Sequence, residues 1–355
     1  MIVLLAALLI TEPVVSHPYT ATAKPVALAR TDTGAVACWT NAPQVLCAVL
    51  RPSGGFDAAV ALPSLMPGAS DTNPAVGWNG SELLVAYEEE GAPNSILLTP
   101  LDRNLHAITQ PIRLMYATKA GAPPSLAWDG KEWLLTQRSF ATRLSPALDF
   151  IQNIAGDSSV LEGAVSGGRF LYVNEPLARG TVVPCSALSY YPPPCTTTVT
   201  TNEWTAMLLP SGKVGLPLSP APIGANATVA SRVRGALLVW PLADASLIAA
   251  PLEGTRLGAT HTVATAGSDI VAPRVAATEN NALLVWEDAN DIRGVLLHAD
   301  GTADGEPFLI AATAQKERHP SALALNETEY VVVYELEGRL ATRFVLIQPI
   351  RRRTR

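Results

Sequence analysis

The feature that most constrains the fold is a repeated unit, seen most completely between Pro273 and Ile310. The unit contains four apolar stretches separated by polar turn residues, including Asp300-Gly301, a strong signal for a tight hairpin. Its second stretch, from Ala282 to Trp286, is apolar at every position, and such a strand must be covered on both faces. A unit of four short strands is therefore the building block of the chain.

Six further copies of the unit align on their opening residue. They begin near Pro25, Pro74, Pro124, Glu162, Ala227 and Pro320, and successive starts, with Pro273 included, lie 49, 50, about 38, about 65, 46 and 47 residues apart. A period of roughly 40–50 residues with four strands per unit is typical of propeller blades. A helical repeat would instead place apolar residues three and four apart over two turns. We number the units repeats 1 to 7 in chain order.

Seven starts predict an all-β fold, a seven-bladed β-propeller with four-stranded antiparallel blades; a six-bladed ring with one degenerate copy is the alternative. The last copy ends after its third strand, near Ile347, and the stretch from Pro18 to Ala23 matches the outer strand that begins at Pro307. We therefore expect the N-terminal strand to close the ring by completing the final blade. The propeller would span residues 17–350, with an inserted loop at about 181–202 and a basic tail at 351–355.

Composition narrows the partners and the compartment. The chain of 355 residues is 48% hydrophobic and carries a formal charge of −6, so it lacks the basic footprint of a nucleic-acid-binding protein. Residues 1–16 resemble the apolar part of an export signal and are too short to span a membrane. We expect a secreted or periplasmic monomer without a transmembrane anchor.

The four cysteines fit an oxidising compartment. Cys38 and Cys47 belong to neighbouring strands of repeat 1, and Cys185 and Cys195 bracket part of the inserted loop in repeat 4. Three pairings are possible, and we expect these two local disulfides because they are the most economical. Neither pair has zinc-ligand spacing or a neighbouring histidine, so we predict no metal and no other cofactor.

An aromatic residue recurs near the end of the second strand in most repeats. The positions are Trp39, Tyr87, Trp240, Trp286 and Tyr334, whereas repeat 3 has Gln137. One interpretation is that the rings fill the wedge between blades, where burial stabilises by about 2–3 kcal/mol each. The other interpretation is an aromatic platform for a sugar or a peptide.

Acidic residues follow these aromatics, and the symmetry of a ring would place them all on one face. They are Glu88, Glu89, Glu90, Glu175, Asp244, Glu287, Asp288, Asp291, Glu335 and Glu337. Such a cluster could hold a cation or a basic partner, or it could simply solubilise the strand ends. The ligand-binding candidates are Tyr87, Glu88, Trp240, Asp244, Trp286, Glu287, Asp288, Asp291, Tyr334 and Glu335, together with Tyr190 and Tyr191 of the inserted loop.

The predicted inner strands argue against catalysis. Glycoside-cleaving chemistry needs two facing carboxylates, but these strands contain no acid, and Arg30 and Arg274 are the only charges at or beside them. We therefore assign no catalytic residue. The expected function is a non-catalytic extracellular or periplasmic binding platform for an unknown protein or glycan. A carbohydrate-active hydrolase or lyase with acids donated by turns is the alternative.

Several copies resemble a known type of repeat. The stretches WNGSELLVAYEEE, ALLVWEDANDIRGVLLHADGTADGEPFLIA and NETEYVVVYELEG are similar to blades of uncharacterised secreted bacterial β-propeller repeat proteins, with their W-N-G … L-V-V-W-x-D … I-x-G … D-G pattern. The resemblance covers residues 18–347, although repeat 3 lacks the W-x-D ending and repeat 4 is interrupted. It implies the propeller fold and specifies no activity.

Overall fold

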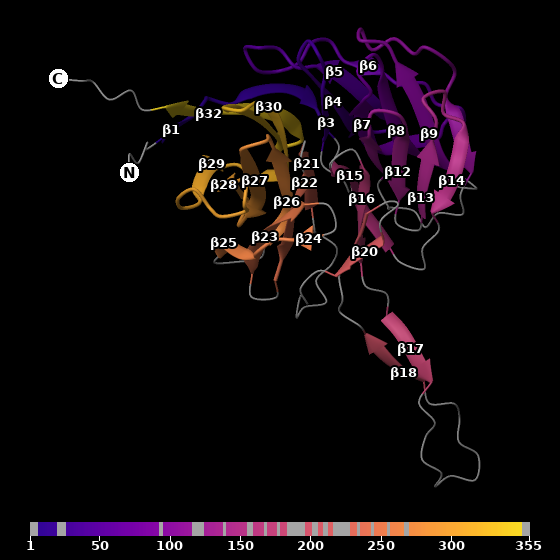
Figure 1. The fold of residues 1–355 in the computed structure, drawn as a ribbon. Coiled ribbons are helices and arrows are strands. Elements are labelled where there is room, and N and C mark those ends of the chain that lie inside the picture. Colours follow the sequence, from indigo (N-terminus) through magenta and orange to yellow (C-terminus); the bar gives the residue numbers. More distant parts are fainter. Residues whose placement is uncertain are drawn as a thin grey trace, which may run out of the picture.

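A computed structural model shows strands and no helix in the part of the chain that it describes. That part comprises residues 6–19, 26–91, 95–115, 124–137, 140–154, 228–232, 235–242, 245–253, 256–265 and 270–349, with the strands alone between 159 and 215. The sheets stand around an axis, with β3, β21 and β26 near the centre (Figure 1). The chain is therefore an all-β propeller with four-stranded antiparallel blades, as the repeat predicts.

Four repeats each form one four-stranded antiparallel sheet whose strands follow in chain order. Repeat 1 forms β3 (Ala27–Arg30), β4 (Ala35–Asn41), β5 (Gln44–Val49) and β6 (Val60–Ala61). Repeat 2 forms β7 (Ser70–Trp78), β8 (Leu83–Glu90), β9 (Ser95–Leu101) and β10 (Ile112–Met115), and repeat 3 forms β11 (Ser125–Trp128), β12 (Trp133–Gln137), β13 (Phe140–Leu144) and β14 (Phe150–Ile154). Repeat 6 forms β26 (Ile270–Ala277), β27 (Asn281–Asp288), β28 (Asp291–His298) and β29 (Phe308–Ala311). In each, the first strand lies innermost.

Repeats 4 and 5 share one nine-stranded sheet. It contains β15 (Ser159–Ser166), β16 (Arg169–Glu175), β19 (Thr205–Leu208), β20 (Gly212–Gly215), β21 (Thr228–Arg232), β22 (Gly235–Pro241), β23 (Ser246–Glu253), β24 (Arg256–Leu257) and β25 (His261–Thr265). The two halves meet at a parallel pair between Ser166 and Arg232. Counted as sheets, the ring has six blades, so the prediction of seven is wrong. A repeat count in the sequence cannot show that two neighbouring units are joined by edge pairing.

The inserted segment of repeat 4 carries a hairpin of its own. Its strands β17 (Ala178–Val182) and β18 (Thr196–Thr200) pair with each other in a separate two-stranded sheet. The ribbon extends away from the ring (Figure 1). The tip of the predicted loop, with Cys185, Tyr190, Tyr191 and Cys195, lies outside the described residues.

The last strand of repeat 7 pairs with strands from the other end of the chain. Its strands β30 (Glu317–Asn326), β31 (Glu329–Leu336) and β32 (Arg339–Pro349) are joined by β1 (Ala6–Ile10) and β2 (Val14–Pro18), which both pair with β32. Ile10 lies opposite Val345, and the Tyr19 amide donates to the Gly338 carbonyl at 2.9 Å. The pairing strands thus precede the stretch from Pro18 to Ala23 expected from the sequence, of which residues 20–23 fall outside the described part.

The described core lies between adjacent sheets. Trp39 of repeat 1, for example, is fully buried in a cluster with Val331 and Val333 of repeat 7, and Trp286 packs with Leu237 and Val239 of repeat 5. Because each blade is apolar on both faces of its second strand, it can be covered only by a neighbour on each side. The ring is the arrangement that supplies both neighbours.

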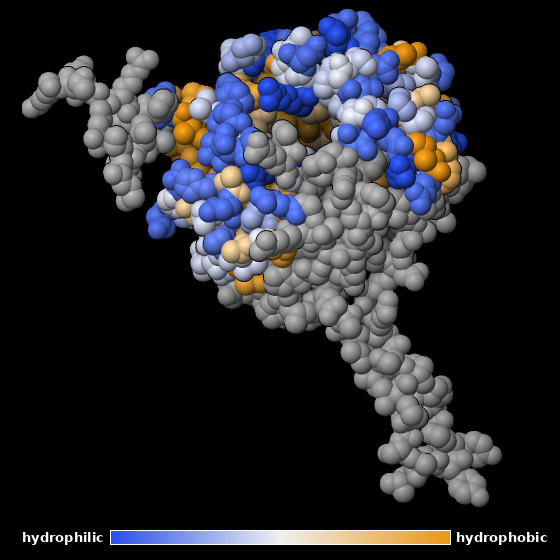
Figure 2. Space-filling model, viewed as in Figure 1, coloured by the Kyte–Doolittle hydropathy of each residue, from blue (hydrophilic) through white to orange (hydrophobic). Residues whose placement is uncertain are grey.

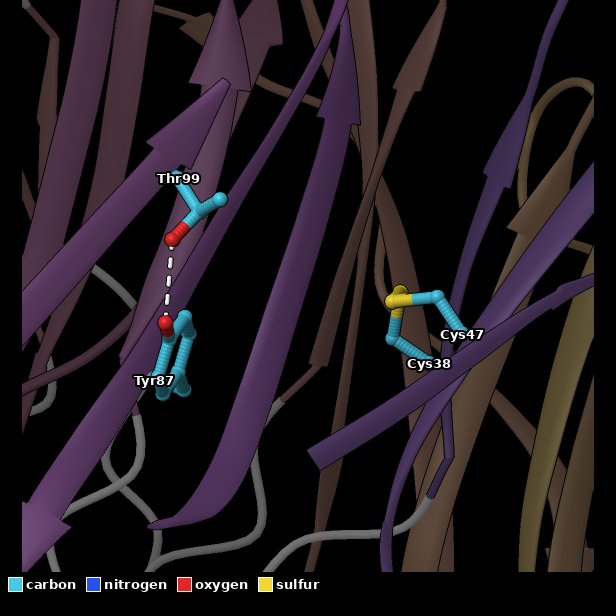
Figure 3. The surroundings of a disulfide bond; sticks show 4 residues. All are labelled: Cys38, Cys47, Tyr87 and Thr99. Atoms are coloured by element: carbon cyan, nitrogen blue, oxygen red, sulfur yellow. Dashed lines mark hydrogen bonds between the residues drawn. A yellow bond between two sulfur atoms is a disulfide. The ribbon is translucent and has the colours of Figure 1, made fainter. Parts of the chain in front are cut away.

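The predicted disulfide of repeat 1 is confirmed. Cys38 on β4 and Cys47 on β5 lie opposite each other in the register, and their sulfurs are 2.03 Å apart (Figure 3). Both side chains are fully buried. The pair therefore ties two neighbouring strands together inside the interface between repeats 1 and 2.

Replacing both cysteines by alanine is expected to lower the free energy of unfolding by about 2–3 kcal/mol, because the bond closes a short loop in the unfolded chain. Urea unfolding at pH 7 measures the loss. Wild-type protein unfolded with and without a reductant is the control, and it should lose a similar amount. An unchanged midpoint in both experiments would contradict the prediction.

Candidate functional site

The recurring aromatics are part of the core. Tyr87, Trp286 and Tyr334 are almost fully buried, and each packs against the repeat that precedes its own in the chain. The Tyr87 hydroxyl donates to the Pro63 carbonyl at 2.6 Å and is hydrogen-bonded to Thr99 (Figure 3). Burial raises the pKa of Tyr87. The placement agrees with the wedge-filling interpretation, and a role of these rings in ligand binding stays a prediction.

Repeat 3 fills its wedge with a different residue. Gln137 occupies the aromatic position, while Trp133, four residues earlier, is 1% exposed and packs with Ala75 and Leu84 of repeat 2. A Cβ at Gly77 would lie 2.6 Å from the Trp133 ring. The Trp133 indole therefore occupies space that is free only because residue 77 is a glycine.

The acidic residues near the ends of the second strands contact a recurring irregularity in the inner strands. In repeats 2, 6 and 7, the residue before the opening proline has a positive φ, at Asn73 (51°), Ala272 (49°) and His319 (52°), and the strand pairing shifts by a bulge there. Such backbone is costly for residues other than glycine and needs support from its surroundings.

Carboxylates supply part of that support within a repeat. Glu88 Oε2 accepts a hydrogen bond from Asn73 Nδ2 at 2.6 Å. Glu335 Oε2 lies 3.0 Å from His319 Nδ1. In both cases, the acid that follows the wedge aromatic binds the side chain of the bulge residue in its own blade.

Residues near the end of the second strand also bind the bulge of the next blade. The backbone amide of Asn73 donates to Thr40 Oγ1 of repeat 1 at 3.1 Å. The backbone amide of His319 donates to Glu287 Oε2 of repeat 6 at 3.3 Å. Backbone donors held in this way would otherwise be poorly satisfied. Much of the acidic charge on this face thus stabilises the ring itself.

The remaining acidic candidates differ in their surroundings. Asp288 Oδ2 pairs with Arg293 Nε at 2.8 Å, Asp291 is half-buried, and Asp244 lies outside the described residues. Trp240 is buried. In the described part, no group of histidine, cysteine or acidic side chains is arranged to hold a metal ion. A binding role for this face stays a prediction.

The opposite face opens into a cavity on the axis. The cavity has a volume of about 1030 Å³, and its lining comes from the inner strands and first turns of repeats 1, 3, 5, 6 and 7. A hollow with apolar atoms inside it and hydrophilic residues around it is visible near the centre of the ring (Figure 2). A smaller cavity of about 160 Å³ is lined by the same inner strands and by β7, and Leu28, Val275 and Ala322 line both cavities.

Two rim segments are fixed by bonds between blades. Arg232 donates to the carbonyls of Glu279 and Ala299, at 2.6 Å each. Glu327 of repeat 7 accepts from the Thr278 hydroxyl at 2.8 Å, as well as from the backbone of Glu279. Burial acts against ionisation of Glu327, but these hydrogen bonds dominate and lower its pKa. These charges therefore shape the rim of the cavity.

Two other side chains that line the cavity, those of Arg30 and Trp128, are accessible to solvent. Arg30 ends β3, is exposed and has no ion-pair partner among the described residues. Trp128 ends β11, is half-buried and contacts Trp133 with ring centroids 4.9 Å apart. The sequence reading singled out neither as a binding residue. Their position in the sequence could have identified them, since each is the last residue of an inner strand and stands directly before a turn.

The fold defines the chain as a β-propeller. It is similar to the WD40 domain of Toxoplasma gondii coronin, with 10% identity, a TM-score of 0.62, and coverage of 98% of this chain and 87% of that chain. A chain in a crystal structure of the mitotic checkpoint complex has 11% identity, a TM-score of 0.57, and coverage of 95% and 94%. Hsv2 of Kluyvelomyces marxianus has 10% identity, a TM-score of 0.50, and coverage of 88% and 90%. No family model and no curated protein matches the chain.

Proposed function

We propose that the protein is a non-catalytic interaction platform that binds its ligand at the axial cavity. The observation that carries the proposal is the 1030 Å³ cavity whose rim combines fixed charges with the two available side chains Arg30 and Trp128. Concave sites with an apolar floor and a few polar groups are the usual form of a ligand pocket. Propellers of this type commonly serve as interaction scaffolds, which is an analogy of fold.

The chemistry of the rim favours a glycan over a peptide. The half-buried indole of Trp128 offers a flat apolar face of the kind on which a sugar ring stacks, and Arg30 offers a planar set of hydrogen-bond donors. The Asp129 carboxylate is already engaged, because its Oδ1 accepts from the amides of Lys131 and Glu132 at 2.9 and 2.8 Å. That engagement supports binding rather than general acid–base work at this position.

Screening on a glycan array and a peptide array, followed by titration of the best ligand, tests the proposal. We expect Trp128→Ala and Arg30→Ala each to weaken binding at least about tenfold, which corresponds to about 1.4 kcal/mol. Arg51→Ala is the matched control, since Arg51 is similarly exposed, does not line the cavity and pairs with Asp57. Unfolding curves of each variant separate lost binding from lost folding.

Other outcomes contradict the proposal in distinct ways. Unchanged affinity in both cavity variants would move the site elsewhere, and the acidic face would be the next surface to test. A peptide as the best ligand would replace the glycan assignment and keep the site. New reducing ends from a bound glycan would establish the alternative, a carbohydrate-active hydrolase or lyase.

We infer that the protein works in an oxidising compartment outside the cytoplasm. The inference is supported by the buried Cys38–Cys47 disulfide, since such bonds persist mainly in extracellular and periplasmic proteins. The described residues include no helix long and apolar enough to cross a bilayer.

We also infer that the N-terminal strands close the ring. The supporting observation is that β1 and β2 pair with the outer edge of β32, the last strand of repeat 7. Thr11 strengthens this junction, because its amide and hydroxyl both bind the backbone of Phe344, at 3.0 and 2.9 Å. Closure in this way removes an open sheet edge.

A further inference from the structure

Repeat 2 contains one more buried carboxyl group than the equivalent positions of repeats 6 and 7. At the entrance of the inner strand, Asp71 lies opposite Glu89, whereas repeat 6 pairs Ile270 with Asp288 and repeat 7 pairs Glu317 with Leu336. Repeats 6 and 7 therefore place one acid at this pair of positions, and repeat 2 places two.

Glu89 has a full set of partners. It is fully buried, and its Oε1 accepts from the Ser64 hydroxyl at 3.2 Å and from the amides of Leu65 and Met66 at 3.0 and 2.9 Å. Its Oε2 forms an ion pair with Arg113. Glu89 is therefore the acid whose negative charge the site is built to hold.

Asp71 has no such partners. Asp71 is 1% exposed, and neither carboxyl oxygen meets the geometry of a hydrogen bond with a described residue. The Ser64 hydroxyl is near enough to lower the pKa of Asp71, but it donates to Glu89 instead. Its backbone amide donates to the Pro43 carbonyl at 2.8 Å, which fixes the residue in place. An ionised carboxylate in this position would be costly, whereas a neutral one is tolerated.

The ionisable groups around Asp71 do not offset its charge. On β8 they are Tyr87, Glu88, Glu89 and the exposed Glu90, and on β10 the cation is Arg113, which already pairs with Glu89. Strands β4, β5 and β9 carry no ionisable group except the disulfide cysteines, and β11 carries none. Arg30 lies at the far end of β3, where it lines the axial cavity.

We propose that the Asp71–Glu89 pair is a pH-sensitive device at the junction of repeats 1 and 2. With a proton on Asp71, the pair holds the Pro43 turn through the Asp71 amide and the segment 64–66 through Glu89. Loss of that proton places two negative charges on directly opposed strand positions. The strain is relieved when the segment 64–66 opens and lets water reach Asp71.

The direction of the pH effect follows from linkage. Burial, and next the charge of Glu89, raise the pKa of Asp71 from 3.8 to about 7, while Ser64 acts in the opposite direction. Between these two values the folded protein keeps a proton that the unfolded chain has lost. Stability therefore falls as pH rises from about 4 to 7, and the full loss is present above 7.

Urea unfolding of wild type and Asp71→Asn at pH 5 and pH 8.5 tests the device. For wild type, the unfolding constant should rise by roughly 10- to 100-fold between the two pH values, the upper limit being set by the two pH units between pH 5 and the folded-state pKa of about 7. Asp71→Asn should remove most of that rise. Asp304→Asn, in an exposed acid, is the control and should leave it unchanged.

A second measurement keeps the test independent of how well the variant folds. NMR titration of the Asp71 carboxyl carbon in wild type should give an apparent pKa near 7, with faster amide exchange at Leu65 and Met66 above that pH. A carboxyl that titrates near 4 would overturn the proposal. An Asp71→Asn protein with the wild-type pH dependence would overturn it as well.

Discussion

A protein that lacks residues 1–16 is expected to lose on the order of 5 kcal/mol of stability and to associate through the exposed edge of β32. The deletion removes β1 and most of β2, and with them the backbone hydrogen bonds to β32, each of which stabilises by about 1 kcal/mol. The open edge then offers unpaired donors and acceptors to another chain. Urea unfolding and light scattering after gel filtration measure the two effects.

Two adjacent residues of β1 provide a matched control in the full-length chain. Leu8 packs against the core between repeats 6 and 7, whereas Leu9 is 46% exposed. Leu8→Asp should therefore lower stability by about 2–3 kcal/mol and Leu9→Asp by less than about 0.5 kcal/mol. A truncated protein as stable and as monomeric as the full chain would contradict the inferred closure.

The N-terminal residues have a second predicted role, as an export signal. The predicted export signal, residues 1–16, covers the same residues as β1 and the first three positions of β2. Cleavage after Ser16 would take away strands that the last sheet uses. Sequencing the N-terminus of protein collected from a culture supernatant or periplasm would show which role these residues keep.

Trp133→Ala is expected to lower the free energy of unfolding by about 3–5 kcal/mol. The ring is 1% exposed and fills the wedge between repeats 2 and 3, so its removal leaves a cavity that the stiff strands cannot close. Equilibrium urea unfolding measures the loss. Trp128→Ala is the matched control, because that ring is only half-buried and should cost about half as much or less.

The same wedge allows a test of specific packing. A Cβ at Gly77 would lie 2.6 Å from the Trp133 ring, so Gly77→Ala should be destabilising in wild type. In a Trp133→Leu background, that clash is absent and the cost of Gly77→Ala should shrink. Additive losses would show that Gly77 and Trp133 are not coupled.

The fold was largely predictable because its main determinants are local. Apolar runs, turn dipeptides and a steady period identify four-stranded blades, and the spacing of Cys38 and Cys47 identifies a cross-strand disulfide. The number of sheets was not predictable, because it depends on one edge contact between Ser166 and Arg232. The pairing of β1 and β2 with β32 was not predictable either, because it uses backbone hydrogen bonds that many apolar stretches could make.

The candidate site was harder to predict for a different reason. The sequence shows which residues are acidic but not which donors face them, so Glu88 and Glu335 gave no sign that they bind the bulges at Asn73 and His319. The axial cavity is assembled from five repeats, each of which contributes a few residues without a motif. The exceptional acid, Asp71, is recognisable only after the strands are aligned in space.

Some of the bulges are hydrogen-bonded to the blade that precedes them in the chain. At two junctions, an amide of one blade is held by the blade before it, Asn73 by Thr40 and His319 by Glu287. Substitution of Thr40 or Glu287 would therefore leave a bulge amide of the following blade without its acceptor, so the destabilisation is expected in that blade as well as at the substituted position.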